Sequence, residues 1–258
     1  MDWNKLSISR RDTPLHAAAT YRLRMTVQYL IKKNGYEKDQ CNNFGETALY
    51  RAAQAGRSGV IEELIAHGAD IGAKVRYWYL KDTTPLILAV ICLQVKAIRV
   101  LLNHGIDVNT FDPNARTCSL YLAASIDTKL TRLLLDRGAF VDLPGQSPTM
   151  TSLHYAVLYT HAFPGALDRV VLLLERGANI NAQSSIGNTA LYMAILAGYQ
   201  DLARFLLQKG ADIALQNKNG KSVLQIARER GLLQWIQEGV PRHIFQNLPN
   251  GPPLHTAI

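Results

Sequence analysis

The stretch Leu206-Leu207-Gln208-Lys209-Gly210-Ala211-Asp212-Ile213 decides the fold of this 258-residue chain, because variants of it return at a nearly fixed spacing. A glycine that follows an apolar run recurs at Gly35, Gly68, Gly105, Gly138, Gly177 and Gly210. Successive glycines of this set are 33, 37, 33, 39 and 33 residues apart. A leucine that opens a second apolar run recurs with a similar period, at Leu15, Leu49, Leu86, Leu120, Leu153, Leu191 and Leu224. Such a period indicates a stack of repeated units.

Each unit has the pattern of two helices followed by an extended turn. Thr13-Pro14 stands where the first, alanine-rich helix begins, because a threonine hydroxyl caps free amides and proline loses no hydrogen bond there. The second helix carries an apolar pair such as Leu101-Leu102 and ends at the glycine, which adopts the left-handed conformation that closes a helix. One unit cannot bury its own apolar face, so it must stack on the next unit.

Two motifs in these units resemble the ankyrin repeat. The opening Asp12-Thr13-Pro14-Leu15-His16-Ala17-Ala18 is similar to TPLHxA, and residues 206–213 are similar to the close LLxxGADxN. The resemblance covers about residues 12–238, in seven units. It implies an all-α fold: an α-solenoid in which helix-turn-helix units carrying β-hairpin fingers form an ankyrin-repeat stack.

The phase of the repeat predicts three segments: an N-terminal extension at 1–11, an ankyrin-repeat domain at 12–239 and a proline-rich C-terminal tail at 240–258. The repeats are expected near 12–44, 45–81, 82–115, 116–148, 149–186, 187–219 and 220–239. Two insertions break the period. One lengthens a finger at 75–81, and the other is a turn-rich loop at 159–165 between the two helices of the fifth unit.

The composition, 48% hydrophobic and 19% charged, predicts a globular protein. The net charge of +8 lies mostly at the two ends, and the neutral middle argues against a nucleic-acid partner. Three cysteines without a CxxC motif indicate neither a zinc site nor a disulfide framework. The longest apolar run, Leu86 to Leu93, is 8 residues, too short to cross a membrane. We therefore expect an intracellular monomer in the cytoplasm, the nucleus or both.

The usual catalytic motifs, GxGxxG, the phosphate-binding loop, HExxH and GxSxG, do not occur in the sequence. His16 and His154 fall in the histidine position of TPLH, where the resemblance implies a ring that hydrogen-bonds neighbouring backbone. The recurring aspartates Asp70, Asp107 and Asp212 share one phase after the glycine, which favours a turn-stabilising role. The sequence thus predicts no catalytic residue, cofactor or metal, and a protein that is not an enzyme.

Two sets of residues are candidates for partner binding. The resemblance places a groove-facing residue two positions after each marker leucine, and from this row we select Arg51, Leu88, Leu122, Tyr155 and Met193. The finger insertion combines aromatic side chains with flanking charge, the composition of an interface hot spot, at Arg76, Tyr77, Trp78, Tyr79 and Leu80. The alternative for both sets is internal packing, with the row under the fingers and the rings folded onto the groove.

The favoured function is a protein-interaction scaffold or adaptor that binds an unidentified protein partner through its concave face and the aromatic finger. The alternative is a binder of an apolar small molecule, or an unusual enzyme acting on it, with the compound held near Leu88, Leu122, Tyr155 and Met193. His154 or Arg51 would then supply the polar anchor. The resemblance also makes the finger asparagines Asn109 and Asn181 candidates for hydroxylation; otherwise they only stabilise the turn.

Overall fold

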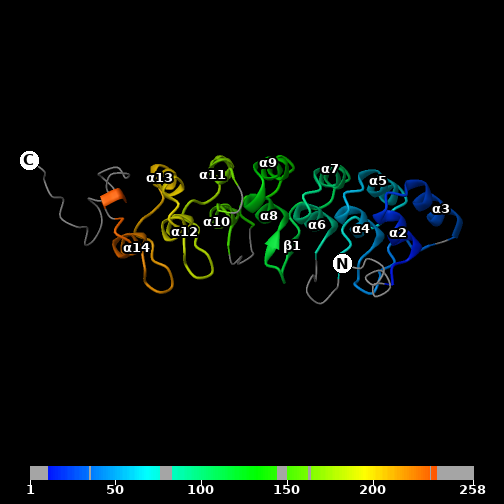
Figure 1. The fold of residues 1–258 in the computed structure, drawn as a ribbon, viewed down its shortest axis with the longest axis horizontal. Helices are drawn as coiled ribbons and strands as arrows, with labels where there is room; N and C mark the ends of the chain where they lie inside the picture. Colours follow the sequence, from blue (N-terminus) through cyan, green and yellow to red (C-terminus); the bar gives the residue numbers. More distant parts are fainter. Residues whose placement is uncertain are drawn as a thin grey trace, which may run out of the picture. The chain divides into compact units, whose positions relative to one another are not determined.

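The computed structural model describes residues 11–34, 36–75, 83–143, 150–161, 164–232 and 234–236. Its helices follow one another in short pairs (Figure 1). In chain order they are α2 (Pro14–Thr20), α3 (Arg24–Asn34), α4 (Ala48–Gln54), α5 (Ser58–Ala66), α6 (Pro85–Ile91), α7 (Val95–Asn103), α8 (Ser119–Ile126), α9 (Thr128–Asp136), α10 (Ser152–Leu158), α11 (Ala166–Glu175), α12 (Ala190–Ala197), α13 (Gln200–Gln208) and α14 (Val223–Glu229).

The predicted caps begin and end these helices. The hydroxyl of Thr47 accepts a hydrogen bond from the backbone N–H of Tyr50, and Thr189 caps α12 in the same way. At the other end, Gly68 has a φ of 78° and Gly210 a φ of 87°, the left-handed conformation expected after each second helix.

The chain divides into two compact units, unit 1 (residues 1–123 and 129–140) and unit 2 (residues 124–128 and 141–258). In unit 1 the first helices α2, α4 and α6 pack against one another in order, and the second helices α3, α5 and α7 form a parallel row (Figure 1). In unit 2, α12 packs between α10 and α14. Both units thus show the predicted all-α, solenoid type of stacking.

The marker leucines form the core of each unit. Six of the seven are at most 1% exposed: Leu15, Leu49, Leu86, Leu120, Leu153 and Leu191. Leu224, in the last repeat, is half-buried. Burial of one leucine side chain contributes about 1.5–3 kcal/mol, so this periodic set is a principal source of stability.

Short antiparallel pairs between helix pairs are present in three of the fingers, within the residues that the structure describes. β1 (Phe111–Asp112) pairs with β2 (Thr117–Cys118), with Phe111 opposite Cys118. Isolated antiparallel bridges join Val75 to Thr83 and Gln216 to Ser222. Within the part of the chain that the structure describes, no helix is long and apolar enough to cross a membrane.

Candidate interaction surface

In unit 2 the first helices present an apolar surface, here called the first-helix face. It consists of Tyr155, Leu158, Tyr159, Met193 and Leu196. Leu158, Tyr159 and Leu196 are 37%, 37% and 39% exposed, and Tyr155 and Met193 are half-buried. The rings of Tyr155 and Tyr159 stack with centroids 6.3 Å apart. Tyr155 and Met193 occupy one repeat position, and Leu158 and Leu196 another. Since α10 and α12 pack side by side, these residues form two adjacent apolar rows.

In unit 1 two members of the predicted groove row are buried. Leu88 is 5% exposed and packs in a cluster with Tyr50, Val75 and Cys92. Val75 forms the base of the lengthened finger. Leu88 therefore packs under this finger, which is the alternative to partner binding given above. Leu122 remains half-buried.

Arg51, predicted to contact a partner, is 8% exposed and has partners within the chain. Its guanidinium donates to Oε1 of Gln54 at 2.7 Å and lies 3.8 Å from a carboxylate oxygen of Glu46. That carboxylate also accepts from the side-chain amide of Asn42 at 2.9 Å. The fold therefore uses Arg51 to balance the buried charge of Glu46.

The aromatic finger residues Arg76, Tyr77, Trp78, Tyr79 and Leu80 lie outside the described residues. Both ends of this finger are fixed, because Val75 donates its N–H to the carbonyl of Thr83 at 3.0 Å. Thr83 in turn donates its hydroxyl to Asp112, a buried residue of β1, at 2.8 Å. Neighbouring fingers are thus joined at their base.

His16 and His154 have the structural role predicted for them. In each ring Nδ1 accepts the backbone N–H of the capping threonine, Thr13 at 3.2 Å and Thr151 at 3.1 Å. The opposite nitrogen, Nε2, donates to a carbonyl of the following repeat, Glu46 at 2.8 Å or Asn188 at 2.9 Å. Both ring nitrogens are occupied, so His154 offers no polar anchor to a small molecule.

Burial lowers the pKa of both histidines below the ordinary value of 6.5, although the bond to the carbonyl opposes this. Well above pH 6.5 both the folded and the unfolded chain hold neutral rings, and the contribution of these histidines to stability is fully present. As the pH falls below that value the unfolded chain binds protons first, so the free energy of unfolding decreases by at most about 1.4 kcal/mol per pH unit for each histidine. The loss ends at the folded-state pKa.

Urea unfolding between pH 5 and 7 checks this expectation. The matched variant is His16→Gln with His154→Gln, because Gln225 makes the same cap in α14, accepting from the N–H of Ser222 at 2.7 Å. We expect the variant to be less stable at pH 7 and to show a flatter pH dependence. An unchanged slope would assign the pH dependence to other groups.

The recurring finger aspartates act within their turns, as predicted. Oδ1 of Asp70 accepts the N–H of Gly72, and Oδ1 of Asp107 accepts that of Asn109, each at 2.9 Å. Asp212 accepts the N–H of Ala214 at 2.8 Å.

The two candidate hydroxylation sites link successive repeats. Oδ1 of Asn109 accepts the N–H of Phe140 at 2.8 Å, and Oδ1 of Asn181 accepts that of Asp212, also at 2.8 Å. Asp39 makes the corresponding bond to Asp70 at 2.9 Å. These side chains therefore stabilise more than their own turn, and their modification stays a prediction.

Arg169 is a structural residue that the motifs did not reveal. Its side chain is fully buried in α11, and it donates to the carbonyl of Pro164 at 2.7 Å. Burial lowers the pKa of the guanidinium, while Asp127 and Asp168 oppose this. Arg169 therefore fixes the end of the inserted loop of the fifth repeat.

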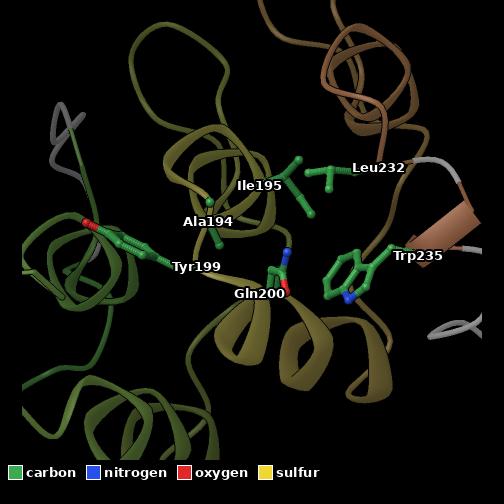
Figure 2. Close-up of a pocket in the computed structure, with 8 residues that line it drawn as sticks. Ala194, Ile195, Tyr199, Gln200, Leu232 and Trp235 are labelled. Atoms are coloured by element: carbon green, nitrogen blue, oxygen red, sulfur yellow. The ribbon is translucent and has the colours of Figure 1, made fainter.

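A small pocket lies at the C-terminal end of unit 2, where Ile195 and Leu232 point toward each other and Trp235 lies beside Gln200 (Figure 2). The guanidinium carbon of Arg204 lies 5.6 Å from the centre of the Trp235 ring. The space amounts to about 140 Å³ but consists of open solvent as well, and its enclosed volume is about 0 Å³. Ligand pockets usually enclose about 300–1,000 Å³. It is also separate from the predicted groove residues.

Two of the three cysteines, Cys92 and Cys118, are protonated at neutral pH. Burial raises the pKa of the Cys92 thiol and raises that of Cys118 to about 11, so neither is a thiolate at neutral pH. Among the residues that the structure describes, no group of three or more His, Cys, Asp or Glu side chains is arranged to hold a metal ion.

Solved structures share this architecture. The ankyrin repeat domain of Bcl-3, described as a unique member of the IkappaB protein family, is 31% identical, with a TM-score of 0.71 over 88% of this chain and 98% of that domain. The human ASB11 ankyrin repeat domain is similar in fold, with a TM-score of 0.72 at 21% identity, over 89% of this chain and 99% of that one.

Two larger proteins match part of the chain. A putative palmitoyltransferase, ZDHHC13 of Danio rerio, is 30% identical over 180 residues, which are 69% of this chain and 26% of that protein. Human ankyrin repeat and SOCS box protein 6 is 30% identical over 144 residues, 55% of this chain and 34% of its own length. The chain therefore spans about a quarter to a third of these relatives.

A family model described as ankyrin repeats (3 copies) matches residues 2–75 and 153–238, more than half of the chain. The matched segments include the capped helix pairs of both units and the histidine bridges described above. This chain belongs to the ankyrin-repeat family.

Proposed function

We propose that the chain is a non-enzymatic protein-interaction module that binds a protein partner through the first-helix face of unit 2. The carrying observation is that Leu158 and Leu196, on adjacent helices, and Tyr159, directly after α10, remain more than a third exposed. Exposed apolar side chains that are grouped together, in contrast to ones scattered singly, mark interaction surfaces. Stacked repeats commonly bind through such extended surfaces.

The aromatic finger at 76–80 is the second proposed contact. Its support comes from the sequence, because Tyr and Trp next to charged residues are enriched at interface hot spots. The bridge between Val75 and Thr83 supports it too, since it holds the two ends of the segment together at a defined place in unit 1. We propose no catalytic role for either surface.

A small-molecule binder has less support. Of its two proposed polar anchors, Arg51 pairs with Glu46 and His154 donates and accepts within the chain. Leu88 is buried under the finger base. A thermal-shift screen with apolar metabolites tests this alternative, because a ligand that binds only the folded chain raises its melting temperature by mass action.

Affinity capture with mass spectrometry tests the proposed function. We expect Leu158→Asp with Leu196→Asp to abolish recovery of partners that the wild-type chain retains, because a desolvated carboxylate in an apolar contact costs several kcal/mol. Trp78→Ala with Tyr79→Ala tests the finger, and we expect it to reduce recovery with little change in thermal stability.

The matched control is Leu167→Asp, since Leu167 is 43% exposed and belongs to the second helix α11, not to a first helix. Partner recovery equal to wild type is expected for this variant. Equal recovery with the Leu158/Leu196 double variant would contradict the proposed site.

A further inference from the structure

The first-helix face carries no ionised side chain on either of its helices. α10 (SLHYAVL) and α12 (ALYMAILA) contain no Asp, Glu, Lys or Arg, and the one titratable imidazole, His154, is buried with a lowered pKa. A partner that covers this face therefore gains nothing from charge at its centre. Any charged side chain placed there loses its hydration without a counterion.

The finger beside this face adds an apolar residue next to a cation. Ile186 is 58% exposed, and its carbonyl accepts the backbone N–H of Lys218 at 3.0 Å. The two fingers are also joined by the side-chain amide of Asn217, which donates to Oδ1 of Asn188 at 2.9 Å. Lys218 itself is exposed, so a residue with a positive charge is joined through its backbone to an exposed apolar residue.

The next first helix, α14, continues this positive border. It packs against α12, and its one acidic residue, Glu229, forms an ion pair with Lys221, whose Nζ lies 2.9 Å from Oε1. Arg228 precedes Glu229 in the sequence and Arg230 follows it, and both arginines are exposed. Since Lys221 neutralises Glu229, Lys218, Arg228 and Arg230 leave this border with a net positive charge.

We infer that the segment bound by unit 2 is a stretch of partner protein with uncharged apolar side chains over α10 and α12, followed by acidic residues that face the border at 218–230. This inference rests on the proposed interaction function and specifies its ligand. The apolar part provides the buried contact. The acidic part sets its direction along the helices and speeds association, because charge complementarity acts mainly on orientation and on-rate.

A random-peptide display library selected on the full chain tests the inference. We expect the selected peptides to combine an apolar stretch with neighbouring Asp or Glu. Their affinity should fall about tenfold or more in Lys218→Glu with Arg230→Glu, and should fall with rising salt. Lys209→Glu is the control, because Lys209 follows the second helix α13 and is exposed.

The outcomes separate the two proposals. Peptides that lose binding to Leu158→Asp with Leu196→Asp, but show no acidic enrichment and no effect of Lys218→Glu with Arg230→Glu, would overturn the acidic ligand and leave the first-helix face as the binding site. Peptides that bind the Leu158/Leu196 variant as well as wild type would overturn both.

Discussion

Arg169→Ala is expected to lower the free energy of unfolding by about 3 kcal/mol, measured by urea denaturation. The substitution leaves a cavity where a large side chain is fully buried, and deletions of this kind cost about 2–5 kcal/mol. It also removes the hydrogen bond to Pro164 that fixes the inserted loop. Hydrogen exchange should therefore rise in residues 159–165.

A second substitution separates packing from hydrogen bonding. Arg169→Met keeps most of the volume and loses only the polar contact, so we expect about 1–2 kcal/mol of destabilisation. Arg228→Ala, at an exposed position of α14, is the matched control and should lie within about 0.5 kcal/mol of wild type. An Arg169→Ala variant as stable as Arg228→Ala would show that the buried guanidinium is not needed.

Gly187→Ala is expected to destabilise the fingers of unit 2 by about 3 kcal/mol. Gly187 has a φ of 81°, which costs a residue with a side chain about 1–2 kcal/mol. An added Cβ would also lie 2.7 Å from the backbone nitrogen of Lys218 and 2.8 Å from the Cα of Asn217. Because both atoms belong to the backbone of the next finger, relief requires the two fingers to move apart.

Gly210→Ala isolates the conformational part of this effect. Gly210 has a similar φ of 87°, but nothing lies within 4 Å of an added Cβ. We expect this control to lose about 1 kcal/mol, measured by the same urea denaturation. Equal losses for the two variants would contradict the close contact between fingers.

The repeating features were predictable because each depends on a local motif. The capping threonines, the histidine bridges and the turn aspartates each occupy a fixed position within the repeat. A residue at such a position has the same environment wherever the motif recurs. The burial of Leu88 and Arg51 was not predictable in this way. At the same repeat position Leu122, Tyr155 and Met193 stay half-buried. The burial of Leu88 and Arg51 therefore depends on contacts outside the repeat motif, namely the packing of Tyr50 and Val75 and the charge of Glu46.

Arg169 shows a signal that a comparison between repeats could have found. It lies eight residues before Gly177, and the residues eight before the other glycines are apolar and at most 4% exposed, at Val27, Val60, Ala97, Leu130 and Leu202. An arginine at this phase therefore indicates either a disrupted core or a buried polar contact. The inserted loop supplies that contact through Pro164.

Hydrogen exchange of the chain with and without a captured partner tests the central claim most directly. Binding at the first-helix face predicts slower exchange around residues 155–160 and 193–199, with little change in the second helices α11 and α13. Protection confined to α11 and α13, or absent from both first helices, would contradict the claim.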